Sequence, residues 1–240
     1  MSAQSDARSY TGVDNLEVMT SATNYLRFLN DSIAKVAGPV GTAQRLLDFG
    51  AGVGTHALDL QARGYAISCV EIDDGLRRRL AAEGLDARPS IGEFDPQSLD
   101  LVYTMNVLEH IEDDLAALRE LHRVLRPSGR LVIYVPALQV LYSSMDRKVG
   151  HLRRYHRRPL MELITRAGFV LDRCAYVDSL GYFTTLLYRL AGSRKGDIGT
   201  SSVSLYDRLV FPLSRAADRL VGSWFGKNLL LVAHRRADAE

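Results

Sequence analysis

Short apolar runs alternate with stretches of helical periodicity from Arg45 onward, and this alternation restricts the possible folds more than any other feature of the chain. It predicts crossover units, in which a helix joins two parallel strands, and hence an α/β protein with a largely parallel sheet. The predicted strands are Arg45–Phe49, Ala66–Ile72, Leu85–Ile91, Leu99–Met105, Arg130–Val135, Phe169–Val177 and Asn228–Arg235.

One helix of this alternation carries clear signals at both ends. Glu112–Asp114 place negative charge in its first turn, where the helix dipole favours it. Arg123 and Arg126 lie in its last turn, and Pro127–Gly129 are expected to end it. Its buried stripe is expected to comprise Leu115, Leu118, Leu121, Val124 and Leu125.

Composition narrows the class of protein only slightly. The 47% hydrophobic and 24% charged residues are those of an ordinary globular protein, and the net charge of +2 points to no polyanionic partner. Cys69 and Cys174 lie in apolar runs and are expected in the core, so neither a disulfide framework nor a metal site is expected. Met1–Ser9 are polar, and no stretch reaches the roughly 18–20 apolar residues of a spanning helix. We therefore expect a cytoplasmic protein.

A glycine-rich turn follows the first predicted strand and precedes a helix, in the segment Leu46–Thr55. Glycine lets a ligand approach the backbone closely. Glu71 ends the next strand, 21 residues after Gly50, where a carboxylate can accept two hydrogen bonds from a ribose. This combination favours an adenosine-containing cofactor at the carboxyl ends of a doubly wound sheet over a purely structural turn.

A nicotinamide dinucleotide is the main rival ligand for this turn. Its G-x-G-x-x-G fingerprint requires glycine at position 55, where this chain has Thr55. Asp48, two residues before Gly50, would repel a pyrophosphate but suits a cofactor with an ammonium group. S-adenosylmethionine has that group, together with a sulfonium and no phosphate, and charge therefore favours it.

These residues resemble the class I S-adenosylmethionine-dependent methyltransferases, in the type 11/12-like subset with small-molecule or lipid acceptors. Leu46–Gly54 resembles their motif I, and Cys69–Asp73 their acidic second-strand motif. Leu99–Ile111 resembles the strand that ends in "LEHI", and Leu125–Leu131 resembles the turn into the fifth strand. The resemblance implies a Rossmann-like, doubly wound, seven-stranded sheet with the last strand antiparallel, helices on both faces and a helical insertion before that strand.

The resemblance also implies roles in donor binding. Asp48, Gly50, Ala51 and Gly52 would line the methionine and ribose end, and Asn106 would face the methionine moiety. Glu71 would take the ribose hydroxyls and Ile72 would pack on the adenine, with Ser90 and Ile91 nearby. Gly92-Glu93 replaces the usual Gly-Asp after the third strand, and the link to Asp100 is short.

Two histidines are candidates for catalysis. His110 lies four residues after Asn106, on the same face if this stretch is helical. It could make a structural hydrogen bond near the donor or contact the donor or acceptor directly. His151 lies in a "D-x-x-x-G-H-x-R-R-Y" stretch similar to that of a subset of these methyltransferases, and it could take a proton from the acceptor or position it.

The segment around His151 is expected to form an acceptor wall. Tyr142, Arg153, Arg154 and Tyr155 are the candidate substrate-binding residues. Between Arg147 and Arg158 there are six Lys/Arg, with Asp146 just before them. They indicate either an anionic acceptor bound by arginine forks or a solvated, partly paired loop.

We expect one methyltransferase domain over residues 1–240. Its parts would be an N-terminal helical lid (1–44, with a helix at Leu16–Val36), a donor-binding core (45–136), an acceptor-side segment (137–180), a helical cap (181–227) and the last strand and tail (228–240). The cap would have two helical stretches around a Gly192–Ser202 loop. Residues 205–225 would form either a core-packing helix hairpin or an interfacial helix that touches lipid.

The expected function is methyl transfer from S-adenosylmethionine to the oxygen or nitrogen of a small-molecule or lipid-like acceptor, with S-adenosylhomocysteine as product. The alternatives are an RNA or protein methyltransferase and an inactive donor-binding protein with the same fold. A nucleic-acid partner is not expected, because the chain has neither a basic domain nor an RNA-binding motif. Peripheral membrane contact through 205–225 is one expectation, and the oligomeric state stays open.

Overall fold

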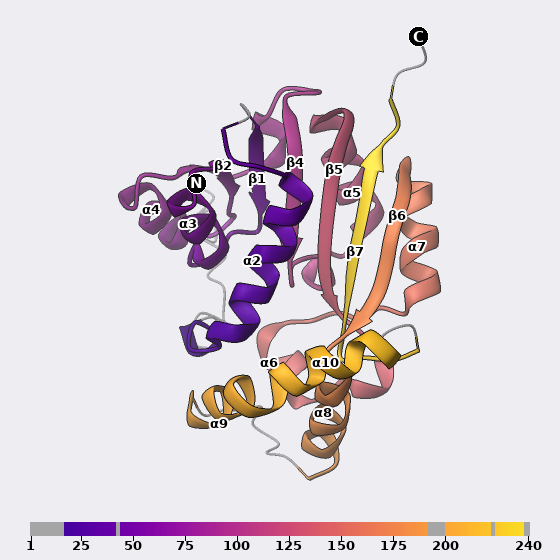
Figure 1. Ribbon diagram of the computed structural model, residues 1–240. Coiled ribbons are helices and arrows are strands. Elements are labelled where there is room, and N and C mark those ends of the chain that lie inside the picture. Colours follow the sequence, from indigo (N-terminus) through magenta and orange to yellow (C-terminus); the bar gives the residue numbers. More distant parts are fainter. Residues whose placement is uncertain (1–16, 42–43, 192–199, 222–223, 238–240) are drawn as a thin grey trace, which may run out of the picture.

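A seven-stranded mixed sheet forms the centre of the computed structural model, which describes residues 17–41, 44–191, 200–221 and 224–237 (Figure 1). The strand order is β3-β2-β1-β4-β5-β7-β6, and β7 runs antiparallel to both of its neighbours. The predicted fold class is confirmed. The strands are β1 (Arg45–Phe49), β2 (Ala66–Val70), β3 (Asp86–Arg88), β4 (Leu99–Met105), β5 (Leu125–Pro136), β6 (Phe169–Val177) and β7 (Asn228–Arg235).

Helices cover both faces of the sheet. The apolar side chains of α2 (Thr23–Ala37), α3 (Thr55–Ala62) and α4 (Asp74–Ala82) pack on one face. Those of α5 (Asp114–Val124) and α7 (Arg157–Arg166) pack on the other. Every residue of β4 is buried, as expected for a central parallel strand between two helical layers.

Several predicted strand ends were wrong, for local reasons. The third strand stops at Arg88, because Pro89 lacks an N–H and Ser90 caps the short 3₁₀ helix η1 (Ile91–Glu93). The second strand ends at Val70, before the exposed Ile72. Helix α5 ends at Val124 and β5 already begins at Leu125, because Pro127 favours an extended residue before it.

The helix expected over Leu16–Val36 is interrupted. Thr20 Oγ1 donates to Glu17 O at 2.6 Å and Ser21 Oγ donates to Val18 O at 2.7 Å, and α2 begins only at Thr23. Its first turn is capped from a distance, since the Asp207 carboxylate accepts hydrogen bonds from Asn24 N at 2.9 Å and Tyr25 N at 2.8 Å. Leu16 itself lies outside the described residues.

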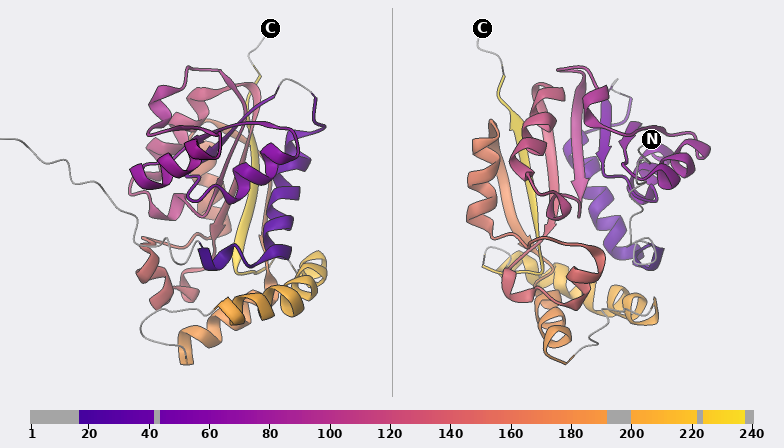
Figure 2. Two further views of the ribbon diagram at one scale, coloured as in Figure 1. Left: turned by 90° about the vertical axis from the view of Figure 1, so that its left-hand side faces the viewer. Right: turned by 180° about the vertical axis from the view of Figure 1, so that it is seen from behind.

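The segment between β6 and β7 is helical, as expected. It comprises α8 (Ser179–Ala191), α9 (Thr200–Leu205), the π-helical turn η4 (Tyr206–Val210) and α10 (Phe211–Val221). Thr200–Ser202 are helical, so the expected loop through Ser202 is too long; residues 192–199 lie outside the described part. These helices, the cap, lie across the end of the sheet to which the parallel strands point (Figure 2). Among the described residues, no helix combines the length and the apolar character needed to cross a membrane.

Candidate active site

The turn after β1 packs directly against the turn after β4. Gly50 has a φ of 83°, and a Cβ at this position would lie 2.4 Å from Val107 Cγ2. Gly50 N and Ala51 N both donate to Val70 O, at 2.9 and 3.1 Å. Only glycine satisfies both requirements at position 50, the positive φ and the contact with Val107. The carboxyl ends of β1, β2 and β4 therefore lie together at one edge of the sheet.

Glu71 holds this turn in place. Its Oε2 accepts a hydrogen bond from Gly52 N at 2.7 Å, and its Oε1 accepts one from Asp73 N at 2.9 Å. The carboxylate is buried, whereas the neighbouring Ile72 is 69% exposed. Farther along the edge, Ser90 Oγ accepts from Gly92 N and Ile91 is half-buried. Sequence reasoning did not foresee the bonds of Glu71 to the backbone.

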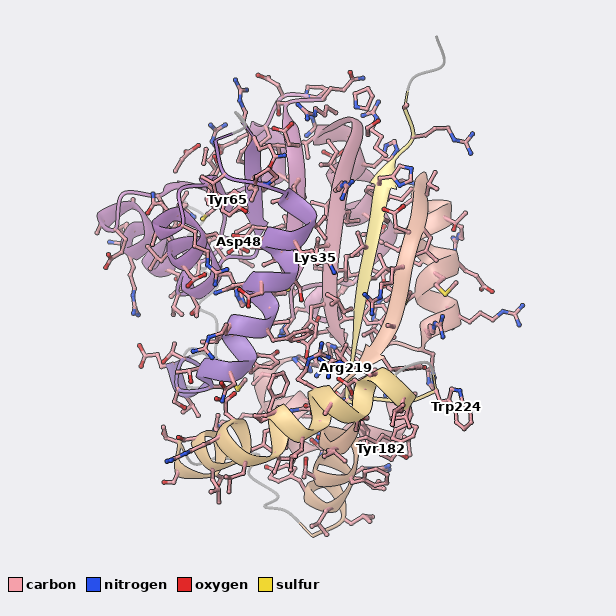
Figure 3. The ribbon with its side chains drawn as sticks, viewed as in Figure 1. Lys35, Asp48, Tyr65, Tyr182, Arg219 and Trp224 are labelled. Atoms are coloured by element: carbon pink, nitrogen blue, oxygen red, sulfur yellow. The ribbon has the colours of Figure 1, made fainter. Side chains whose placement is uncertain are left out.

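The structure places Asp48 in surroundings that disfavour the negative charge assumed for it in the sequence analysis. Its side chain is buried inside β1, beside Cys69 and Tyr103 of the two flanking strands (Figure 3). Burial, with a smaller contribution from the nearby Glu71, raises the pKa of Asp48 to about 8. Oδ2 has no hydrogen-bond partner among the described residues. This shift favours the protonated carboxyl in the chain without a ligand, whereas the sequence argument assumed a negative charge.

Asn106 lies at the end of β4 with a φ of 56°. Its N–H donates to Tyr134 O at 2.8 Å, and its Nδ2 donates to Tyr25 Oη of α2 at 3.3 Å. Leu108–His110 form a single 3₁₀ turn, η2. The α-helical spacing assumed for Asn106 and His110 is therefore wrong. Tyr25 was missed because no pattern in α2 points to β4.

The two candidate histidines lie together. Their ring centroids are 4.8 Å apart at an interplanar angle of 81°. His151 Nδ1 pairs with Asp146 Oδ1 at 2.8 Å, and His151 Nε2 lies 3.6 Å from Glu109 Oε1. Burial, with a smaller contribution from the neighbouring His151, lowers the pKa of His110 to about 4. Burial also raises the pKa of Glu109 to about 8. Glu109 and Asp146 were not selected from the sequence.

Asp146 is the centre of the loop that carries His151. It caps α6 (Ser144–Val149) in a capping box with Ser143, whose N–H donates to Asp146 Oδ2 at 2.8 Å. Arg154 donates to both carboxylate oxygens, at 2.8 and 3.0 Å. Burial alone would raise the pKa of Asp146, but hydrogen bonds from His151 and Arg154 hold it below its usual value.

The four predicted substrate-binding residues all make contacts within the chain. Tyr142 Oη donates to His151 O at 2.7 Å, and Arg153 donates to Asp114 Oδ2 at 2.9 Å. The buried Tyr155 Oη donates to Leu108 O at 3.1 Å. Since Arg154 is buried against Asp146, the arginine forks expected for an anionic acceptor are occupied by carboxylates. The partly paired loop is what these contacts favour.

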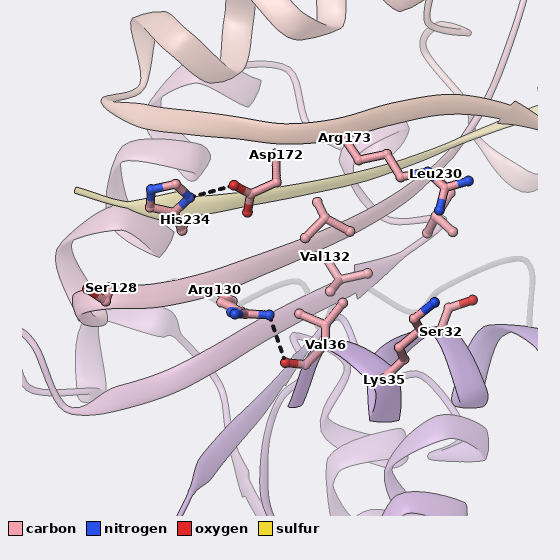
Figure 4. A pocket seen from close by; sticks show the side chains of 11 residues that line it. Ser32, Lys35, Val36, Ser128, Arg130, Val132, Asp172, Arg173, Leu230 and His234 are labelled. Atoms are coloured by element: carbon pink, nitrogen blue, oxygen red, sulfur yellow. Dashed lines mark hydrogen bonds and ion pairs between the residues drawn. The ribbon is translucent and has the colours of Figure 1, made fainter. Parts of the chain in front are cut away.

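A hollow of about 520 Å³ lies elsewhere, between α2 and the open face of β5, β7 and β6 (Figure 4). Lys35, Arg130 and His234 are among its lining residues. Arg130 pairs with Leu101 in the first half of β4 and with His234 near the end of the antiparallel β7, so the hollow lies away from the carboxyl ends of the parallel strands. None of the predicted donor-binding residues lines it.

The sheet order, with β7 as its antiparallel strand, and the glycine turn joined to an acidic second strand define a class I S-adenosylmethionine-dependent methyltransferase. A family model described as a methyltransferase domain matches residues 21–173, more than half of the chain. The chain belongs to this family, and S-adenosylmethionine is its cofactor.

Relatives of known name agree with this assignment. The chain is 36% identical over 110 residues to a demethylmenaquinone methyltransferase of Clavibacter sepedonicus, covering 42% of this chain and 43% of the relative. It is 29% identical over 139 residues to a probable S-adenosylmethionine-dependent methyltransferase of Mycobacterium tuberculosis, covering 55% and 51%. The chain thus spans about half the length of the curated relatives it matches.

Solved structures share the fold at low sequence identity. Phosphoethanolamine N-methyltransferase 2 of Haemonchus contortus, in complex with phosphomonomethylethanolamine and S-adenosylhomocysteine, has a TM-score of 0.62 at 16% identity, over 98% of this chain and 61% of that one. The [4+2]-cyclase SpnF has a TM-score of 0.59 at 17% identity, over 99% and 100%. Because one of these neighbours is named as a cyclase, fold similarity alone does not identify the reaction.

Proposed function

We propose that this methyltransferase modifies the oxygen or nitrogen of a small-molecule or lipid-like acceptor that binds between the cap and the pair His110/His151. The observation that carries the proposal is the position of this pair. His110 follows β4 and Asn106, at the edge of the sheet across which the cap lies, and the ring of His151, which follows α6, contacts His110 there. Ligands of doubly wound sheets bind at this edge.

The residues at the edge fit the donor. Asp48 offers a buried carboxyl oxygen without a partner among the described residues, which suits an ammonium group. Ile72 presents an exposed apolar side chain next to Glu71, which suits an adenine ring. Gly50, Ala51, Gly52, Ser90, Ile91 and Asn106 are the remaining proposed donor contacts. The donor, when bound, supplies a methyl carbon whose bond to sulfur breaks, leaving the electron pair on sulfur.

His151 is the proposed contact to the acceptor atom that receives the methyl. Asp146 fixes its ring through Nδ1, so Nε2 is the nitrogen that faces Glu109 and His110. Methyl transfer depends mainly on alignment of the two reacting atoms, which an oriented ring can provide. Tyr142, Arg153, Arg154 and Tyr155 hold the loop, and through it they position His151.

The names of two similar proteins support the acceptor class. One is named for demethylmenaquinone and another for phosphoethanolamine. The basic run Arg147–Arg158 offers little to a nucleic-acid acceptor, because Arg153, Arg154 and Arg158 pair with Asp114, Asp146 and Glu162.

The cap supports a lipid-like acceptor. Phe211 and Ser214 are buried against the body of the protein. Large apolar side chains are exposed on the cap helices, namely Phe183, Leu187, Leu190, Leu205, Leu209, Leu213 and Leu220. Trp224, which follows α10, is also exposed and projects away from the helices (Figure 3). We propose that 205–225 combines both expected roles, a core-packing face and a face for lipid. The division into lid, core, acceptor segment and cap is part of the same proposal.

The test combines donor binding with product detection. Calorimetry on the full chain should show binding of S-adenosylmethionine and S-adenosylhomocysteine. Incubation with a donor labelled on the methyl group, and with quinol or phosphoethanolamine acceptors, should then yield a methylated product by mass spectrometry. Binding of NADH with no binding of either adenosyl compound would overturn the donor site. Donor binding with transfer to RNA or protein alone, or to nothing, would favour the alternative functions.

A further inference from the structure

We infer that Glu109, His110 and His151 form a binding site for a divalent transition-metal ion. Each of these residues offers one ligand atom, and the three atoms lie within 4.8 Å of one another. Two imidazole nitrogens and one carboxylate oxygen form a set that suits ions from Mn²⁺ to Zn²⁺. Tetrahedral ligands at ~2.1 Å from such an ion are about 3.4 Å apart. Small side-chain rotations would therefore close the site.

The carboxylate of Glu109 is the strongest sign of a missing ligand. The residue is 0% exposed, and neither of its side-chain oxygens has a hydrogen-bond partner among the described residues. A buried carboxylate without a partner is costly, so native proteins almost always satisfy it. A cation between Glu109 and the two histidines would be bound by Oε1, the oxygen that lies toward His151, or by both carboxylate oxygens.

Both histidines have the second partner that metal-bound histidines usually have. His151 Nδ1 pairs with the Asp146 carboxylate at 2.8 Å, which leaves Nε2 toward Glu109. His110 hydrogen-bonds to the backbone of Gly150. A metal-ligating histidine typically contacts a carboxylate or a carbonyl through its other nitrogen, and this contact orients the ring. The rings are therefore held in place before any ion arrives.

Charge around the cluster favours a cation. Glu109 and Asp146 bring two carboxylates, and Arg154 brings the guanidinium bound to Asp146. Lys227 also lies nearby, but Asp178 is its principal charge partner. Glu109 and Asp146 therefore outnumber Arg154 by one acidic group. His110 is partly exposed, and the side chain of His151 is 9% exposed.

This inference rests on the proposed function only for its role in the reaction. At this position an ion would bind a hydroxyl oxygen of the acceptor and lower its pKa, and the proton would pass to solvent. The ion would hold the deprotonated oxygen next to the proposed donor site at Asn106. The ion would thus make the acceptor an O-nucleophile, and His151, as a ligand of the ion, would act on the acceptor oxygen through the ion instead of contacting it directly.

The experiment begins with the full chain treated with a chelator and then dialysed. Calorimetry with Zn²⁺ and Mn²⁺, and the visible absorption of Co²⁺, would measure cation binding directly. We expect one ion per chain and a cobalt spectrum typical of nitrogen and oxygen ligands. Glu109→Gln and His151→Ala should each weaken binding at least ~10-fold, the lower bound for disturbing such a site.

His234→Ala is the matched control, because His234 also pairs with an aspartate, Asp172, at 2.8 Å, but lies at the hollow of Figure 4. It should bind the ion like the wild type. The inference is overturned if the wild-type chain binds no ion, or if both cluster variants bind as the control does. If a cluster variant does not fold, the stoichiometry and cobalt spectrum of the wild type decide.

Calorimetry with S-adenosylhomocysteine on the same samples separates the two proposals. Donor binding without ion binding would overturn the metal site and leave the methyltransferase proposal standing. Ion binding without donor binding would overturn the proposed methyl transfer and leave the metal site standing.

Discussion

The carboxylate of Asp207, in the cap, accepts a hydrogen bond from the backbone N–H of Tyr25 at 2.8 Å and so closes the first turn of α2. The side chain of Tyr25 in turn contacts Asn106 at the end of β4. One carboxylate thus connects the cap, the N-terminal helix and the donor edge of the sheet.

Asp207→Ala should lower the free energy of unfolding by about 1–2 kcal/mol, the usual cost of losing a helix cap. It should also weaken donor binding, because α2 positions Tyr25 against Asn106. Urea denaturation and calorimetry with S-adenosylhomocysteine measure the two effects. Asp172→Ala, at an exposed position, serves as the control. Unchanged stability in Asp207→Ala would mean that α2 forms without the cap.

Glu71→Ala should weaken donor affinity by about 1.5–3 kcal/mol, the range for hydrogen bonds to a charged group. The bonds from Gly52 N and Asp73 N give a second reason, since their loss also loosens the turn. Glu93→Ala removes an exposed acid from the same edge and should bind the donor normally. Calorimetry compares them, and equal affinities would show that another group holds the ribose.

His151→Ala should lower turnover while donor affinity stays nearly unchanged, because we propose that the ring acts on the acceptor and not on the donor. Loss of a group that handles the acceptor proton commonly costs ~10²–10⁴ in rate, and loss of positioning costs less. His110→Ala should instead disturb donor affinity. Both quantities are measured for each variant once an acceptor is known. Full activity in His151→Ala would place the acceptor elsewhere.

The raised pKa of Asp48 predicts a pH dependence of stability. The pKa of the Asp48 carboxyl is 3.8 in the unfolded chain and about 8 in the folded chain. Between these values the folded chain keeps a proton that the unfolded chain has lost. The stabilisation is complete below the lower value and is lost as pH rises through the upper one. Asp48→Asn should flatten this fall in urea midpoints. An identical slope in the variant would assign the effect to other groups.

The outward apolar residues of the cap predict binding to anionic lipid. The exposed charged side chains described on α8 to α10 are arginines, Arg189, Arg208 and Arg219, while Asp207 is buried and Asp218 is largely so. Sedimentation with phosphatidylglycerol vesicles should carry the protein down, and phosphatidylcholine vesicles should do so less. The double variant Leu209→Ser/Leu213→Ser should reduce sedimentation, whereas Val40→Ser, outside the cap, should not. Equal sedimentation of the double variant would exclude this surface.

The sheet was predictable because its signals are local. The apolar run Leu99–Met105 and the glycines after Phe49 each determine their own segment. The residues that depend on distant partners were not predictable. Asp207 caps a helix 182 residues earlier at Tyr25, and Arg154 was selected as a ligand contact although Asp146 already occupies its guanidinium. His110 and His151 were selected from two separate segments, and no local signal indicated that their rings contact each other or that Glu109 lies beside them.

Asp146 caps α6, anchors Arg154 and orients His151 with a single pair of oxygens. Replacement of Asp146 would therefore disturb both the folding of this loop and the orientation of His151, so selection for either property retains the residue. A chain of this family that lost its chemistry would still be under pressure to retain this carboxylate. Retention of Asp146 in a relative is thus a sign of an intact loop rather than of activity.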